Sequence, residues 1–107
     1  MANRFAEDSV IGSILIDQTC FAPVRDSLLP SDFSSDLNRA VWETVCTMSV
    51  RGDTIDPVTI HGEMIRTGRD VPGLSRYFAE LMEKTPTAAN VAEYVKLVRS
   101  AAVRDRI

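Results

Sequence analysis

The sequence predicts an all-α domain, a compact bundle of about six helices, and three features of the chain lead to this prediction. Apolar residues recur at the three- and four-residue spacing of a helix face along nearly the whole chain. No stretch between these segments alternates apolar and polar residues over four positions, as a half-buried strand would. The gaps are short, and 107 residues with 45% hydrophobic content suffice for a single core.

The first two helices are predicted within the first 28 residues. The first carries an apolar face made of Val10, Ile11, Ile14 and Leu15. Two acids that suit a first helical turn, Glu7 and Asp8, precede this face. Gly12 on this helix would allow a neighbour to approach its backbone closely. A short second helix fits residues 20–28, and Leu29-Pro30 ends it. In the loop that follows, Phe33 is expected to anchor the core.

The third predicted helix has the widest apolar face of the first half, so it is expected to be central to the core. Its face consists of Leu37, Ala40, Val41, Trp42, Val45, Cys46 and Met48. Ser35 or Asp36 would cap its start, and Gly52 follows its end.

Asp56-Pro57 predicts the start of the fourth helix, because aspartate caps helices and proline fits the first helical position. This helix is expected to run to about Thr67, before Gly68. Pro72-Gly73 then forms a turn. The fifth helix carries apolar residues at i, i+3, i+4, i+7 and i+8, namely Leu74, Tyr77, Phe78, Leu81 and Met82.

The sixth predicted helix opens between residues 87 and 90, after the break at Thr85-Pro86, and Asn90 would cap it. One face of the helix is apolar, with two further apolar residues beside it: Val91, Tyr94, Val95, Val98 and Ala102, then Leu97 and Ala101. No stop signal precedes Ile107, so we expect the helix to continue in a longer parent chain.

Residues with obvious chemistry are scarce. None of the five glycines precedes a lysine, so the chain lacks the Gly-Lys-Ser/Thr loop that holds nucleotide phosphates. His61 is the only histidine, and with two separated cysteines it forms no recognisable metal site. We expect His61 to be a packed or half-exposed residue on a helix face that includes Val58 and Ile65. The sequence therefore predicts no catalytic residue, cofactor or metal in this chain.

Net charge and cysteine content further limit the classes of protein to which the chain could belong. A net charge of −3 argues against a dedicated nucleic-acid binder, and the basic residues near the end are expected to be a solvated helix face: Lys96, Arg99, Arg104 and Arg106. Cys20 and Cys46 lie in apolar segments and are expected to be free thiols. Without an export signal or an apolar run of about 20 residues, the expected location is the cytoplasm, with no membrane partner.

Six segments, taken in order, give a more specific signal. Residues 52–60, GDTIDPVTI, are similar to a Gly-x-x-Ile-Asp-x-Val-Thr-Leu pattern, and residues 85–94, TPTAANVAEY, to a Pro-Ser-Ala-Asn-x-x-x-Tyr pattern. Together with the segments at 7–17, 29–33, 38–42 and 74–81, and with Arg104, they resemble the N-terminal domain of DnaB-type replicative DNA helicases. The chain departs from the family pattern at Ser34 (usually Tyr), Asn38 (usually His) and Pro72 (usually Gly).

The resemblance implies that two domains of the parent protein have different roles. In this family a C-terminal motor uses ATP and Mg²⁺ to move along single-stranded DNA, and the N-terminal domain is a helical collar. The collar has a globular head and a long hairpin that pairs protomers within the hexamer, and it receives primase and sometimes a helicase loader. Here residues 1–88 would be the head and residues 89–107 the truncated first arm of the hairpin. The motor is absent, and DNA would be reached only through the parent assembly.

The resemblance also implies an interface on the last helix. Part of its apolar arc is expected to pack on the head, and the remainder to seek a symmetric partner. The candidate interface residues are Val91, Tyr94, Val95, Leu97, Val98, Ala101 and Ala102.

Two other interpretations stay open at the level of sequence. One is a free-standing helical DNA-binding protein that reads DNA with the helix at residues 56–68 or 74–84, although their faces are apolar rather than basic. The other is a helicase loader or the helicase-binding domain of primase. The segments at 55–59 and 86–94 favour the helicase.

Overall fold

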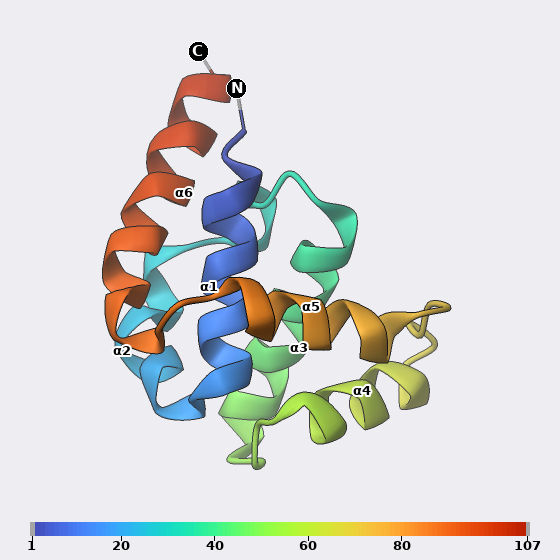
Figure 1. Cartoon of the computed structure of the whole chain (residues 1–107). Coiled ribbons are helices and arrows are strands. Elements are labelled where there is room, and N and C mark those ends of the chain that lie inside the picture. The colour runs from blue at the N-terminus through green and yellow to red at the C-terminus, as the bar shows by residue number, and fades with distance from the viewer. Residues whose placement is uncertain (1, 107) are drawn as a thin grey trace.

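The computed structural model describes residues 2–106, and within this range the chain consists of six α-helices joined by turns and short 3-10 segments, with no strand (Figure 1). This confirms the predicted all-α class. The α-helices are α1 (Arg4–Ile16), α2 (Phe21–Val24), α3 (Asp36–Arg51), α4 (Pro57–Arg66), α5 (Leu74–Lys84) and α6 (Val91–Arg106).

Helix α1 lies at the centre of the bundle. α6 runs antiparallel beside it, α5 crosses its other side, and α3 packs behind it, while α4 lies against α3 and α5 at the edge (Figure 1). The caps predicted for α3 and α4 are present. The Ser35 side chain accepts from the Asn38 backbone N–H at 3.2 Å, and Asp56 accepts from the Thr59 N–H at 2.8 Å.

One local prediction was wrong. The helix expected at residues 20–28 is three shorter pieces, of which only Phe21–Val24 is α-helical, flanked by 3-10 turns at Gln18–Cys20 and Arg25–Ser27. Pro23 lies in the first turn of α2, where its missing N–H costs no helical hydrogen bond, and the buried side chains of Phe21 and Val24 fix the segment to the core. A 3-10 turn at Ala88–Asn90 precedes α6, and Thr87 caps this turn, its hydroxyl accepting from the Ala89 N–H at 3.1 Å.

The core is centred on Trp42, which is fully buried on α3. Its ring meets Phe21 edge-on at a centroid distance of 5.1 Å and Phe33 at 5.3 Å. The expected core role of Phe33 is thereby confirmed: this loop residue is only 1% exposed.

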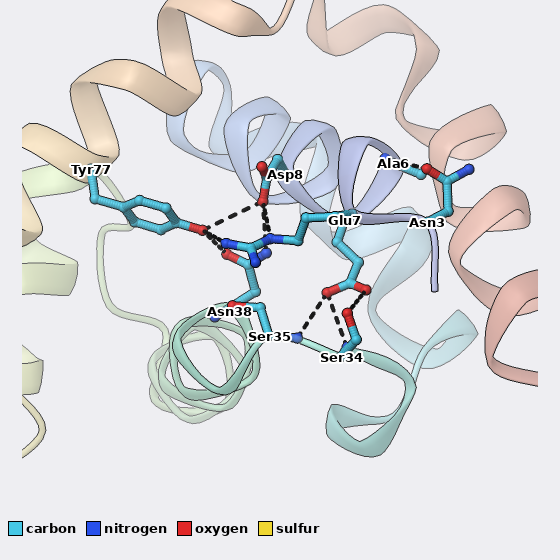
Figure 2. A network of polar contacts seen from close by, with 9 residues as sticks. Asn3, Ala6, Glu7, Asp8, Ser34, Ser35, Asn38 and Tyr77 are labelled. Atoms are coloured by element: carbon cyan, nitrogen blue, oxygen red, sulfur yellow. Dashed lines mark hydrogen bonds and ion pairs between the residues drawn. The ribbon is translucent and has the colours of Figure 1, made fainter. Parts of the chain in front are cut away.

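A buried carboxylate fixes α1 to the start of α3. Glu7 is 2% exposed and accepts three hydrogen bonds, from the Ser34 N–H at 3.0 Å, the Ser34 hydroxyl at 2.5 Å and the Ser35 N–H at 3.2 Å (Figure 2). A buried charge of this kind is tolerated only when hydrogen bonds replace its hydration. Glu7 therefore ties two elements together, a role that its place in the first helical turn did not predict.

Beside it, a second set of polar contacts joins α1, α3 and α5. The buried Asn38 amide donates to Asp8 at 2.9 Å and accepts from the Tyr77 hydroxyl (Figure 2). Burial raises the pKa of Tyr77, which keeps its hydroxyl protonated as the donor. Helix α1, on which α6 rests, is thus held by hydrogen bonds as well as by apolar packing.

At the α3–α4 edge, Glu63 is clamped by two guanidinium groups. It lies 2.7 Å from Arg66 and 3.0 Å from Arg51. These contacts, Arg66 first, hold the pKa of Glu63 at about 2 instead of 4.5.

Because the pKa of Glu63 is lowered on folding, its ionised form stabilises the fold above about pH 4.5, and this contribution is lost as the pH falls towards 2. Glu63→Gln is expected to flatten the decline in melting temperature between these pH values. The matched change Glu80→Gln, at an exposed position on α5, should leave the profile as it is. A Glu63→Gln profile parallel to that of the unmodified protein would contradict the clamp.

Candidate interaction surface

The face of α6 that was predicted as an interface mostly belongs to the core. Five of the seven candidate residues are at most 9% exposed and pack inward, namely Val91, Val95, Val98, Ala101 and Ala102. The apolar arc is therefore covered more completely by the head than the sequence suggested. The reason is that α6 packs on α1, α2 and the 3-10 turn at Pro30–Asp32 at once.

Two of the predicted interface residues remain accessible. Leu97 is 49% exposed, and Tyr94 is half-buried at the edge of the packed face. Val103, near the end of α6, is also 42% exposed. Charged side chains surround Leu97: Lys96 lies 3.4 Å from Glu93, and Arg99 lies 3.5 Å from the buried carboxylate of Asp32. Leu97 is thus an apolar residue within a charged surface, on a helix that is firmly attached to the head.

A second accessible apolar surface lies between α4 and α5. It is an open groove of about 490 Å³, lined by Pro57, Val58, His61, Gly62, Ile65, Ser75, Phe78, Ala79 and Met82. Val58 is 80% exposed and Ile65 56%, whereas Ile60 and Met64 make the buried face of α4. Helix α4 therefore has two apolar faces, and the expectation that Val58 and Ile65 mark its packed side was wrong.

His61 lies in this groove, half-buried as expected. Its Nε2 is 2.9 Å from an Asp70 carboxylate oxygen, and its Nδ1 is 3.3 Å from the Ser75 hydroxyl. These two contacts connect α4 to the turn before α5 and to α5 itself. The side chain therefore links α4 to α5, with one ring nitrogen beside a carboxylate and the other beside a hydroxyl group.

The remaining reactive groups are isolated. Cys20 and Cys46 are free thiols, and burial raises the pKa of Cys20 to about 11, which disfavours the reactive thiolate. Across residues 2–106, no three histidine, cysteine or acidic side chains are grouped so as to hold a metal ion. In the same range, no helix is both long and apolar enough to cross a membrane.

Comparison with known proteins shows which family the chain resembles. The family described as DnaB-like helicase N terminal domain matches residues 1–100. The replicative DNA helicase DnaB of Geobacillus stearothermophilus is 30% identical over 104 residues, which cover 95% of this chain and 23% of that protein. That of Pasteurella multocida is 33% identical over 106 residues, covering 95% and 22%. The chain thus spans less than a quarter of the length of these relatives.

A solved structure agrees with the sequence comparison. The crystal structure of the N-terminal domain of DnaB helicase from Mycobacterium tuberculosis matches with a TM-score of 0.91 at 30% identity, over 98% of this chain and 77% of that one. The agreement includes α6 and its position against the head, because nearly the whole chain is covered. The chain therefore belongs to the family of DnaB-like helicase N-terminal domains.

Proposed function

We propose that this chain is the collar domain of a bacterial replicative DNA helicase and acts in the cytoplasm as a scaffold. The observation that carries the proposal is the match to a DnaB N-terminal domain along nearly the entire chain. The parent protein would carry the ATP- and Mg²⁺-dependent motor and would contact DNA through the complete assembly. Residues 1–88 would be the head, and residues 89–107 the beginning of the hairpin arm.

In this scaffold α6 has two sides with separate tasks. Its inner side, with Val95 and Val98 buried, fixes the helix to the head. Its outer side, with Leu97 exposed, would pair with another protomer and so build the outer tier of a ring. Primase, and in some systems a loader, would dock on the collar. Such docking increases the effective concentration of the primase near the unwound strand and requires no chemistry in this domain.

The helicase assignment has a direct test in the parent gene. The codons that follow Ile107 are expected to encode the second hairpin arm and then a Gly-x-x-x-x-Gly-Lys-Ser/Thr loop within a motor domain. A parent protein without a nucleotide-binding loop would refute the proposal and favour a loader or a primase-side domain.

Pairing through α6 predicts that the chain self-associates in the micromolar range and that Leu97→Glu weakens this association at least tenfold. A glutamate charge buried in the contact would cost far more free energy than the burial of the leucine side chain contributes. Sedimentation equilibrium over a range of concentrations measures the effect. Leu97 is the position to change because Val98 is only 1% exposed, so a charge there would disrupt the head itself.

The control is Val50→Glu, which places the same charge at an 80% exposed valine near the end of α3. It should leave both folding and association unchanged. An unmodified chain that stays monomeric up to near-millimolar concentration would refute pairing through this helix.

A further inference from the structure

Three side chains at the α4–α5 groove form a hydrogen-bonded series of an acid, an imidazole and a hydroxyl group, which we call the triad. His61 of α4 stands in the middle, with its Nε2 2.9 Å from Asp70 Oδ1 and its Nδ1 3.3 Å from Ser75 Oγ. Asp70 belongs to the turn between the two helices, and Ser75 to the first turn of α5. The fold thus brings together the three kinds of group by which serine hydrolases activate their nucleophile.

The carboxylate of the triad determines which nitrogen of the imidazole is the base. A carboxylate only accepts hydrogen bonds, so Nε2 of a neutral His61 carries the proton and donates it to Asp70. Nδ1 then keeps its lone pair and accepts from the Ser75 hydroxyl. The contact of 3.3 Å is long for a nucleophile and its base, and such contacts tighten when a substrate binds. Asp70 is therefore a positioning residue that makes His61 a base towards Ser75.

The place of Ser75 in its helix provides for the negative charge that develops on a carbonyl oxygen during acyl transfer. Ser75 and Arg76 are the second and third residues of α5, which is 11 residues long. The N–H groups of a first helical turn have no partner within the helix, and the helix dipole is positive at this end. The backbone N–H groups of Ser75 and Arg76 can therefore stabilise an oxyanion that forms at the serine.

The groove supplies an apolar surface next to the hydroxyl group. Ser75 is exposed, so a small ester can reach it, while His61 is 27% exposed. Both residues line the groove of about 490 Å³, and Phe78 and Met82 add apolar surface to the same lining. An acyl chain of a few carbons that lay against these side chains would leave its carbonyl carbon beside the serine.

We propose that Ser75 is a nucleophile for esters with a short apolar acyl chain, with His61 as its base and Asp70 as the positioning residue. Ser75 Oγ bonds to the ester carbonyl carbon and its proton passes to His61 Nδ1. The ester C–O bond then breaks as His61 gives this proton to the departing alcohol. Water attacks the acyl-serine in the same way, gives its proton to His61, and the acid leaves as the proton returns to Ser75 Oγ. This activity is separate from the proposed collar function, so its failure would leave the helicase assignment untouched.

Two probes applied to the whole chain test the nucleophile. The chain should hydrolyse p-nitrophenyl butyrate faster than buffer alone, and Ser75→Ala should lower this excess rate by about tenfold or more. A fluorophosphonate should form a phosphorus–oxygen bond to Ser75 Oγ with loss of fluoride, and peptide mass spectrometry locates the adduct. Ser75→Ala removes one exposed hydroxyl group and should leave the melting temperature unchanged. The control, Ser100→Ala, removes an exposed serine of α6 and should change neither result.

Variants of the other two residues distinguish the triad from a histidine that acts alone on an activated ester. Because His61 is the only histidine, His61→Gln should remove the excess rate. Asp70→Asn should lower kcat by about tenfold or more with KM and melting temperature unchanged, since an amide can donate to Nε2 and leave the proton on Nδ1. An unchanged kcat in Asp70→Asn would refute the positioning role.

The proposal as a whole is wrong if Ser75→Ala keeps the unmodified rate while His61→Gln loses it, because His61 then acts without a nucleophile. It is equally wrong if the chain shows no rate above that of buffer, or if the fluorophosphonate is found on other residues and not on Ser75.

Discussion

Trp42→Ala is expected to destabilise the domain by about 3–5 kcal/mol, the usual range for removing a large buried ring. Trp42 is fully buried and contacts Phe21 and Phe33, so it joins α3 to the two irregular segments that precede it. These segments consist of short helical pieces of three or four residues each. The loss should therefore loosen residues 18–33 in addition to leaving a cavity. Urea denaturation followed by circular dichroism measures the change.

Trp42→Phe distinguishes packing from hydrogen bonding at this position. Among the described residues, the indole Nε1 of Trp42 is buried without a hydrogen-bond partner. Removing this N–H therefore sacrifices no bond, and the phenyl ring keeps much of the aromatic contact. Trp42→Phe should cost less than half as much as Trp42→Ala. Equal losses would show that an unseen acceptor, and not ring packing, makes Trp42 important.

The helices themselves could be predicted because their signals are local. Capping residues such as Ser35 and Asp56 stand beside apolar residues in helical register, and both report on a few neighbouring positions. The segment around Pro23 was harder, since it is divided into short helical pieces and the packing of Phe21 and Val24 into the core depends on other helices. The same limit applied to α4, where two apolar faces are present and only tertiary packing decides that Ile60 and Met64 are buried.

The candidate surface was predicted less accurately than the fold for a related reason. An apolar arc on α6 indicates contact, but it does not say whether the contact is the head or another molecule. The structure assigns Val91, Val95 and Val98 to the head and leaves Leu97 exposed. Glu7 shows the opposite case. Its charge in a first helical turn is typical of an exposed acid, and its buried bonds to Ser34 and Ser35 come from residues distant in sequence.

Gly12→Ala is the second change expected to have a large effect, because α5 ends directly against this glycine. A methyl group at position 12 would lie 2.0 Å from the Thr85 hydroxyl oxygen and 2.8 Å from the Leu81 carbonyl oxygen. Neither atom moves easily, since the buried Thr85 hydroxyl donates to that same carbonyl at 2.8 Å. Helices α1 and α5 would have to separate, so we expect a loss of about 2–3 kcal/mol, at the upper end for overpacking. Chemical denaturation provides the measurement.

Gly62→Ala on α4 is the matched control, since a methyl group there meets nothing within 4 Å. Alanine favours a helix over glycine by up to about 1 kcal/mol, so this variant should be slightly more stable than the unmodified chain. Adding Thr85→Ala to Gly12→Ala should restore part of the lost stability, because it removes the 2.0 Å contact and leaves the one to the Leu81 carbonyl. If Gly12→Ala proved as stable as Gly62→Ala, α5 would not pack against α1 as closely as the structure shows.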